Sequence, residues 1–413
     1  MAWTFTSAWV LAAYLVLGRW LVRCRVPGRD IVFALVNLAT VYYFYFSESA
    51  GYRCFTLYVI LATFQYLIMR WGNGESDSLF WLAFLTPIGI FAALRYVPLS
   101  ALTGLSAQLR SKLVREPDFT FASLFIGLSY FVFRTSHLVL EVRNSITPRP
   151  SLWQYLSFAF FLPTLAVGPI NPYHRHERAF EGVERTSIPI GSALLRVLVG
   201  AVKYRFIAGL VDQLGYSKLL LDGYPHLWID LPVASIAYYL YLYCNFSGFC
   251  DIAIGCAGLM GISVAENFDS PFAARNLKDF WNRWHITLSQ YMRDVVFSPL
   301  SKTLVRAFGP SQANQAIALT ILVVFLIVGV WHGVGWHYLA FGAAHALGVI
   351  VTHYYTIFLK RFLGKDHFAA YNRSRMIEAI AISVTFMYVA ATLFLFANDW
   401  DTMKNIFSVL QHS

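Results

Sequence analysis

A histidine at position 332 lies just beyond a long run that carries no charge. The run Ala316–Val328 is charge-free, and His332 follows within the motif Gly329–His337. Ionisable side chains at membrane depth tend to face a cavity and to mark a functional path, although a histidine hydrogen-bonded between helices is the structural alternative. Neutral imidazole can accept a hydroxyl proton near neutral pH, as acyl transfer from a thioester to an alcohol requires. His332 is therefore predicted to be a general base.

Glycines surround this histidine at positions 329, 333 and 335. Because glycine has no side chain, we expect these positions to allow close approach of backbone or substrate and to break the helix at the histidine. Ordinary close packing between helices would explain the same glycines.

A second histidine, His285, follows the polar and tryptophan-rich stretch Phe280–Trp284. It lies within the segment 271–311, where charged residues alternate with large apolar ones. Such a segment is too charged to face lipid throughout, so it is predicted to be an interfacial helix or a re-entrant one beside protein or a water-filled cavity. Either placement would bring His285 near an internal cavity. A hydrogen-bonded histidine on a polar interfacial helix is the structural alternative.

Other catalytic chemistries have less support. A serine nucleophile would need a strand-to-helix elbow such as G-x-S-x-G, which the chain does not contain. His332 and His337 are five residues apart and do not share one helical face, which disfavours a metal site built with His345. The sequence predicts no metal site. The cysteines show no paired metal spacing and are assigned to packing; they are Cys24, Cys54, Cys244, Cys250 and Cys256.

The elements that must position the two histidines are membrane helices. Hydrophobic residues make up 58% of the 413 residues and charged residues only 13%, against about 25% charged in an average soluble domain. Runs long enough to cross a bilayer predict an all-α, polytopic integral membrane protein with about ten or eleven transmembrane helices, forming a single unit over 1–413. The predicted spans are 3–21, 31–47, 54–70, 79–97, 119–140, 151–170, 190–211, 232–262, 316–331, 334–359 and 376–397.

The net charge of +10 does not indicate a nucleic-acid partner. The basic residues form short clusters between apolar runs instead of one continuous basic face. We interpret them as charges that orient the chain in the lipid bilayer.

Several blocks of the sequence together resemble the bacterial branch of the membrane-bound O-acyltransferase (MBOAT) family. The resemblance covers roughly residues 119–360, and the N-terminal third lacks clear motifs. The matching blocks are Phe125–Tyr130, Gly168–Ile170, Asn245–Gly255, Glu266–Phe268, Phe280–Ser289, Arg293–Asp294 and Trp331–Gly333.

The resemblance implies a helical fold around a central funnel or tunnel, with re-entrant or interfacial helices and two functional histidines matching His332 and His285. It implies a thioester donor from the cytoplasm, acetyl-CoA or an acyl carrier protein, and no bound cofactor. The acceptor would be a hydroxyl of a cell-envelope polysaccharide, reached from the outer side of the bacterial cytoplasmic membrane. A periplasmic or membrane-anchored partner protein is expected.

The family motifs also contain the residues expected to bind or orient substrate. With His332 as general base, His285 or Asn282 would orient a group or stabilise developing negative charge. Trp331, Arg283 and Asp251 are the further candidates in these motifs.

Two bacterial activities fit these motifs. Asp251 in the stretch Asn245–Gly255 favours the polysaccharide O-acetylation members, whereas the length and Asn282 favour the D-alanylation type that acylates teichoic acids. Acetyl transfer is the preferred prediction and D-alanyl transfer the alternative. A transporter or channel is the alternative from another class, because buried histidines and broken helices also serve proton relays and substrate sites.

Overall fold

The computed structural model describes most of the chain, in the stretches 5–24, 26–47, 51–72, 76–96, 127–182 and 188–411. In these stretches the secondary structure is helical, apart from one isolated β-bridge between Phe268 and Trp284. The all-α prediction is confirmed. The predicted span 119–140 lies partly outside the described residues.

The described chain divides into two compact units. The first comprises Met1–Val199 and Cys250–Ala265, and the second comprises Gly200–Phe249 and Glu266–Ser413. The long helix α12 (Asp230–Met260) contributes residues to both. That the chain acts as a single unit over 1–413 stays a prediction.

The first unit contains mainly membrane-length helices joined to short ones. The apolar run 151–170 is not one helix here: α7 ends at Ala159, and a separate short turn follows at Leu162–Thr164. Pro163 in this turn has no N–H group to donate to a continued helix. The helices are α1 (Phe5–Arg23), α2 (Arg29–Tyr45), α3 (Gly51–Trp71), α4 (Asp77–Tyr96), α6 (Leu128–Arg143), α7 (Leu152–Ala159), α8 (Tyr173–Phe180) and most of α9 (Ile190–Ala201).

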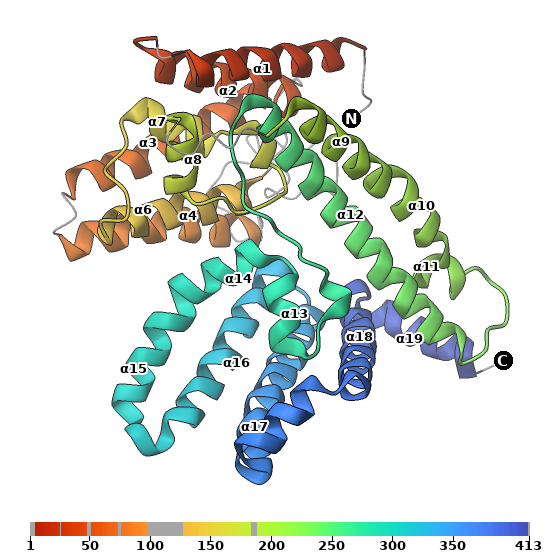
Figure 1. Cartoon of the computed structure of the whole chain (residues 1–413). Coiled ribbons are helices and arrows are strands. Elements are labelled where there is room, and N and C mark those ends of the chain that lie inside the picture. The colour runs from red at the N-terminus through yellow and green to blue at the C-terminus, as the bar shows by residue number, and fades with distance from the viewer. Residues whose placement is uncertain are drawn as a thin grey trace, which may run out of the picture. The chain divides into compact units, whose positions relative to one another are not determined.

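The second unit carries both predicted histidines. Short helices come before the long helix α12 and again before the long helix α16. Helices α15 and α16 pack against each other as a helical hairpin (Figure 1). The helices are α10 (Ala208–Val211), α11 (Tyr216–Leu219), the first part of α12, α13 (Leu277–Arg283), α14 (Ile286–Met292), α15 (Ser298–Phe308), α16 (Ala313–His332), α17 (Trp336–Arg373), α18 (Arg375–Ala397) and α19 (Trp400–Gln411).

Five of the described helices are long and apolar enough to cross a membrane: α3, α12, α16 with its preceding turn, α17 and α18. A bilayer core of about 30 Å requires about 20 apolar residues in a helix. The chain is therefore a multi-pass membrane protein. By contrast α13 and α14, with 7 residues each, are too short to cross, so the segment 271–311 is broken into short helices.

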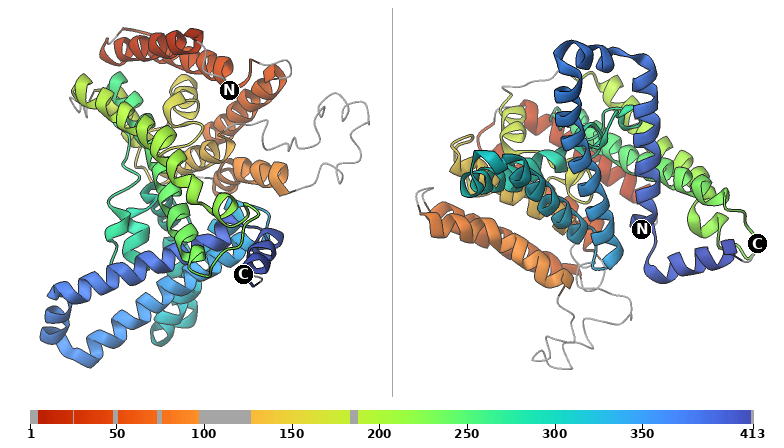
Figure 2. Two further views of the ribbon diagram at one scale, coloured as in Figure 1. Left: turned by 90° about the vertical axis from the view of Figure 1, so that its right-hand side faces the viewer. Right: turned by 90° about the horizontal axis from the view of Figure 1, so that it is seen from below.

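Helices α16 and α17 lie unusually close to each other because glycines face the contact. A Cβ atom built on Gly329 would lie 2.5 Å from the carbonyl oxygen of Tyr338, and one on Gly342 would lie 2.4 Å from that of Phe325. Any larger residue would push the helices apart, which is the packing role that small residues have in membrane proteins. Helix α18 then runs back along α17 (Figure 2).

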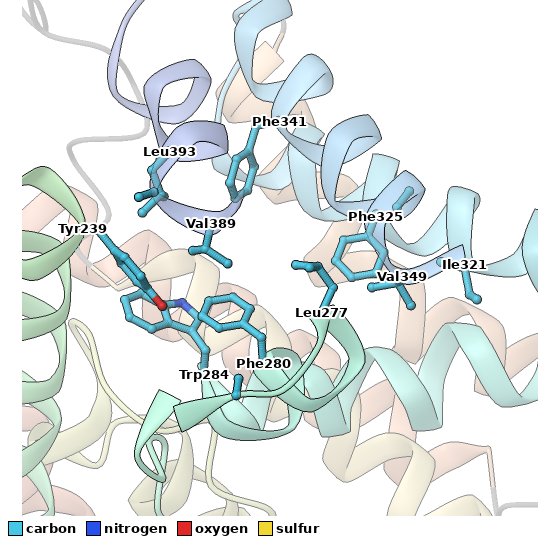
Figure 3. Close-up of a cluster of buried hydrophobic side chains, with 13 residues drawn as sticks. Tyr239, Leu277, Phe280, Trp284, Ile321, Phe325, Phe341, Val349, Val389 and Leu393 are labelled. Atoms are coloured by element: carbon cyan, nitrogen blue, oxygen red, sulfur yellow. The ribbon is translucent and has the colours of Figure 1, made fainter. Parts of the chain in front are cut away.

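A core of buried aromatic and aliphatic side chains joins these helices. It draws Tyr239 from α12, Phe280 from α13, Phe325 from α16, Phe341 from α17 and Leu393 from α18. Figure 3 shows the rings of Phe280 and Trp284 side by side, with Tyr239 next to Trp284. The core thus packs α13 against four membrane-length helices, and the predicted histidines lie at its edge.

Candidate active site

His332 is the last residue of α16. The chain becomes extended at Gly333, so the expected helix break at this histidine is present. Its imidazole packs edge-on against the ring of Phe396, with a centroid distance of 4.9 Å, and lies 4.5 Å from the ring of Trp331. Aromatic rings of α16 and α18 therefore enclose the histidine.

His285 occupies the junction between α13 and α14 in a left-handed backbone conformation, with φ 46° and ψ 51°. For a residue other than glycine this conformation costs on the order of 1–3 kcal/mol and persists only where the surroundings impose it. Backbone hydrogen bonds on both sides impose it here: Asp269 N–H donates to the Arg283 carbonyl, and Ile286 N–H donates to the Asn267 carbonyl. In this conformation the imidazole packs edge-on against the ring of Phe246, with a centroid distance of 4.7 Å.

The Asn267 side chain fixes the orientation of His285. Its Oδ1 accepts hydrogen bonds from the Thr287 N–H at 3.2 Å, from the Thr287 hydroxyl at 2.9 Å and from His285 Nδ1 at 3.2 Å. Since a backbone N–H can only donate, the atom facing it must be the amide oxygen, and His285 Nδ1 must carry the proton. His285 Nε2 is then the unprotonated nitrogen, and it has no hydrogen-bond partner among the described residues.

Both histidines line one small cavity of about 70 Å³. His285 is only 4% exposed, and burial together with nearby His332 lowers its pKa to about 3. An imidazole with so low a pKa is neutral at physiological pH and keeps its Nε2 lone pair available. The remaining walls are apolar or aromatic, apart from His345 and Tyr239. The structure thus brings together the two predicted catalytic residues from α16 and from the α13–α14 junction.

A third histidine, His345, lines the same cavity but is fully engaged in hydrogen bonds. The Trp281 indole N–H donates to His345 Nδ1 at 3.2 Å, and His345 Nε2 lies 3.0 Å from the Thr392 hydroxyl. Because an indole can only donate, the His345 proton is on Nε2 and is given to Thr392. The sequence suggests His345 only as a possible metal ligand. The spacing of His345 from Trp281 and Thr392 along the chain gives no signal of a contact with either residue.

A second, larger cavity of about 520 Å³ adjoins the first. Trp281 and Leu288 line both cavities. Asn282 lines the larger cavity, where its side-chain oxygen accepts a hydrogen bond of 3.0 Å from Arg293. Its walls are otherwise mainly apolar, with Lys278, Arg293 and His353 as its basic residues.

The other predicted site residues lie outside the lining of the two cavities. Trp331 stands next to His332 with its ring 6.2 Å from that of His285, so it supports the site from behind. Arg283 pairs with Asp279 at 2.9 Å and reinforces α13. Asp251 belongs to the first unit and pairs with Arg196 at 3.1 Å. Their roles in binding or orienting substrate stay predictions.

The three histidines His332, His337 and His345 do not converge on one point, because His337 is not part of the lining that the other two share. His337 Nδ1 donates to the carbonyl of Leu395 at 3.0 Å, while His345 is bound as described above. Among the described residues, no group of three or more histidine, cysteine or acidic side chains has the arrangement of a metal site.

Comparison with known proteins gives the family. The model of the MBOAT, membrane-bound O-acyltransferase, family matches residues 41–396. The chain is 31% identical to a teichoic acid D-alanyltransferase of Streptococcus thermophilus over 300 residues, covering 68% of this chain and 71% of the relative. It is 30% identical to a teichoic acid D-alanyltransferase of Bacillus subtilis, covering 66% and 68%. A peptidoglycan O-acetyltransferase of Helicobacter pylori is 30% identical, covering 57% and 42%.

The family match extends over most of the chain and includes both histidine motifs, α12 and the aromatic core between them. The chain therefore belongs to the membrane-bound O-acyltransferase family and is an acyltransferase.

Proposed function

We propose that this chain transfers a small acyl group, D-alanyl in the first instance, from a thioester to hydroxyl groups of a teichoic acid-type polymer of the cell envelope. The observation that carries this choice is the extent of the matches. Relatives named as D-alanyltransferases align over about two thirds of both chains, whereas the named peptidoglycan O-acetyltransferase aligns over 57% of this chain. This reverses the preference for acetyl transfer that the motifs suggested.

The small cavity supports a direct transfer between two bound substrates. A neutral histidine accepts the proton of the acceptor hydroxyl as its oxygen attacks the thioester carbonyl. The tetrahedral intermediate then collapses, the carbon–sulfur bond breaks, and the proton passes to the departing thiolate. The products are an ester on the polymer and a free thiol. We assign the general base to His332, as the sequence predicted.

The tautomer of His285 limits what it can do. With its proton on Nδ1 and held by Asn267, His285 presents only a lone pair at Nε2. A lone pair can accept a hydrogen bond from a hydroxyl but cannot stabilise an oxyanion. We therefore propose that His285 orients the acceptor hydroxyl, which is the first of its two predicted roles.

The larger cavity has the properties expected of a donor site. Its long apolar wall would accommodate the arm of a thioester carrier, and Lys278 and Arg293 are exposed basic groups that suit phosphate on such an arm. We propose that an acyl carrier protein loaded with D-alanine presents the thioester here from the cytoplasm. A periplasmic or membrane-anchored partner would receive or guide the polymer at the cytoplasmic membrane.

The lining of the small cavity suits the charged D-alanyl group. It contains no carboxylate and, besides its histidines, seven aromatic residues: Tyr239, Phe246, Phe280, Trp281, Trp284, Phe341 and Phe396. Aromatic faces attract an ammonium group through cation–π interactions, by about 0.5–2 kcal/mol each. Acetyl, which is neutral, would fit the same space without this attraction.

Transfer can be measured on purified protein in membranes with a carrier protein loaded with labelled D-alanine. We expect label to pass to a polyglycerol phosphate acceptor, and His332→Ala to lower the rate about 10²–10⁴-fold by removing the base. His285→Ala should lower it strongly while expression and folding are retained. His367→Ala, at an exposed position, is the matched control.

Two outcomes would contradict the proposal. Solute flux that needs no thioester and survives His332→Ala would indicate a transporter. Efficient transfer of acetyl from the same carrier, with no transfer of D-alanyl, would restore acetylation as the function. Mass spectrometry of the native polymer with and without the gene distinguishes the two acyl groups in the cell.

A further inference from the structure

The two cavities of the second unit are separated by very little protein. The cavity with the catalytic histidines measures about 70 Å³ and its neighbour about 520 Å³, and the residues common to both linings are Trp281 and Leu288. Trp281 is on α13 and Leu288 on α14, so the wall is formed where the two short helices meet. The indole is the larger of these two side chains.

The orientation of Trp281 is fixed from behind. Its indole N–H donates to His345 Nδ1, and His345 in turn donates to the Thr392 hydroxyl, which lies 3.0 Å from the carbonyl of Tyr388. The chain of donors runs in one direction and ends on a backbone acceptor of α18. Phe325 packs edge-on against the indole at 5.2 Å between centroids. The indole is therefore held by three helices and has little freedom to turn.

The size of the smaller cavity limits what can bind beside the histidines. A water-sized sphere needs about 10–15 Å³, so the cavity of about 70 Å³ has room for about five to seven such spheres. Alanyl, with five non-hydrogen atoms, and acetyl, with three, are groups of this size or smaller. A longer acyl chain would need the space that lies on the other side of Trp281.

We propose that Trp281 is the residue that restricts the transferred acyl group to acetyl or alanyl size, and that His345 and Thr392 are positioning residues that hold its indole in place. This inference rests on the proposed function, since it concerns the acyl group of the same reaction. Removing the indole would join the two cavities. A straight apolar acyl chain could then extend from the histidines into the larger cavity and lie beside the carrier arm within its volume of about 520 Å³.

The test compares acyl thioesters on one carrier protein, loaded with acetyl, butanoyl or hexanoyl groups. The quantity measured is the ratio of kcat/KM for hexanoyl to that for acetyl. In Trp281→Ala we expect this ratio to rise at least about tenfold. Each methylene of the acyl chain that becomes buried should raise kcat/KM for hexanoyl about fourfold. Trp281→Phe, which keeps a ring, should change it less.

The positioning residues are tested with a conservative pair. Thr392→Val removes the hydroxyl that receives the His345 proton, so the indole should loosen and the ratio should rise by a smaller factor. Thr392→Ser keeps the hydroxyl and should restore the wild-type ratio. A merely structural role for Thr392 would lower all three rates equally. Phe272→Ala, in the same core but outside both linings, should keep the wild-type ratio.

A second measurement does not depend on turnover. Ketone analogues, in which a methylene replaces the thioester sulfur, can be titrated by calorimetry with acetyl and hexanoyl tails. We expect the wild type to bind the acetyl analogue more tightly and Trp281→Ala to bind the hexanoyl analogue at least as tightly. If the wild type binds the acetyl analogue and Trp281→Ala gains nothing for hexanoyl, this inference is overturned and the proposed function stands. If neither analogue binds and no thioester is turned over, the proposed function fails and the inference fails with it.

Discussion

The Asn267 side chain offers the sharpest test of how the active site is organised. Asn267→Ala removes the acceptor of three hydrogen bonds, from the Thr287 N–H, the Thr287 hydroxyl and His285 Nδ1. At about 0.5–1.5 kcal/mol each, their loss should lower the free energy of unfolding by about 1.5–4.5 kcal/mol. The left-handed backbone conformation of His285 would also lose some of the contacts that impose it.

We expect Asn267→Ala to lower kcat by more than the loss of folded protein would explain. Without the amide oxygen, neither the ring orientation of His285 nor the nitrogen that carries its proton is fixed. We expect kcat to fall about 10²-fold or more, toward the value of His285→Ala. The assay is D-alanyl transfer at a temperature where the variant remains folded, checked by size-exclusion chromatography. Asn372→Ala, at an exposed position, is the control.

The matched variant Asn267→Asp separates orientation from packing. It keeps an oxygen in place for Thr287 and His285, but its carboxylate should raise the pKa of His285 above its wild-type value of about 3. His285 would then become protonated, and inactive, as the pH falls toward the raised value. We expect the acidic limb of the kcat profile to move to higher pH. Wild-type turnover in Asn267→Ala, or an unchanged pH profile in Asn267→Asp, would refute the role given to Asn267.

Two further predictions concern stability. Gly342→Ala would place a Cβ atom 2.4 Å from a carbonyl oxygen of α16, so it should lower the free energy of unfolding by about 1–3 kcal/mol, measured by thermal unfolding. Gly209→Ala, whose Cβ atom would have nothing within 4 Å, should not lower it. Equal losses in the two variants would contradict the close contact. Asp222 raises the pKa of His226 above its ordinary value of 6.5, so the charged imidazole contributes stability at low pH that is lost as the pH rises through the raised pKa. His226→Gln should therefore flatten the dependence of Tm on pH, and an unchanged slope would argue against this ion pair.

The sequence by itself determined the class of protein and the two central residues. Hydropathy is a local property of the chain, so an all-helical membrane protein could be predicted without any knowledge of packing. An imidazole beside the charge-free run Ala316–Val328 is also a local signal, and it pointed to His332. His285 was found through a motif that resembles the family, and the structure places it in the same cavity as His332.

Neighbours in sequence did not all prove to be neighbours in the site. Asn282 and Arg283 adjoin Trp281 along the chain, yet Asn282 lines only the larger cavity and Arg283 pairs with Asp279. The direction in which each side chain leaves a short helix decides this, and a motif does not contain that information. The motif Glu266–Phe268 is part of the family resemblance, but nothing in it singles out Asn267, because the partner of Asn267, His285, lies 18 residues away.

Only the tertiary structure decided how the site is held and bounded. The hydrogen bonds from Trp281 through His345 to Thr392 join α13, α17 and α18. Trp281 and His345 are 64 positions apart in the sequence, and His345 and Thr392 are 47 positions apart. The proton positions on His285 and His345 follow from partners that can only donate or only accept, which are brought into contact by folding. The cavity volumes likewise depend on side chains from six α-helices packing together: α12, α13, α14, α16, α17 and α18. The sequence therefore pointed to His332 and His285, while the fold determined the proton position and the orientation of His285 and the size of the cavity that both histidines line.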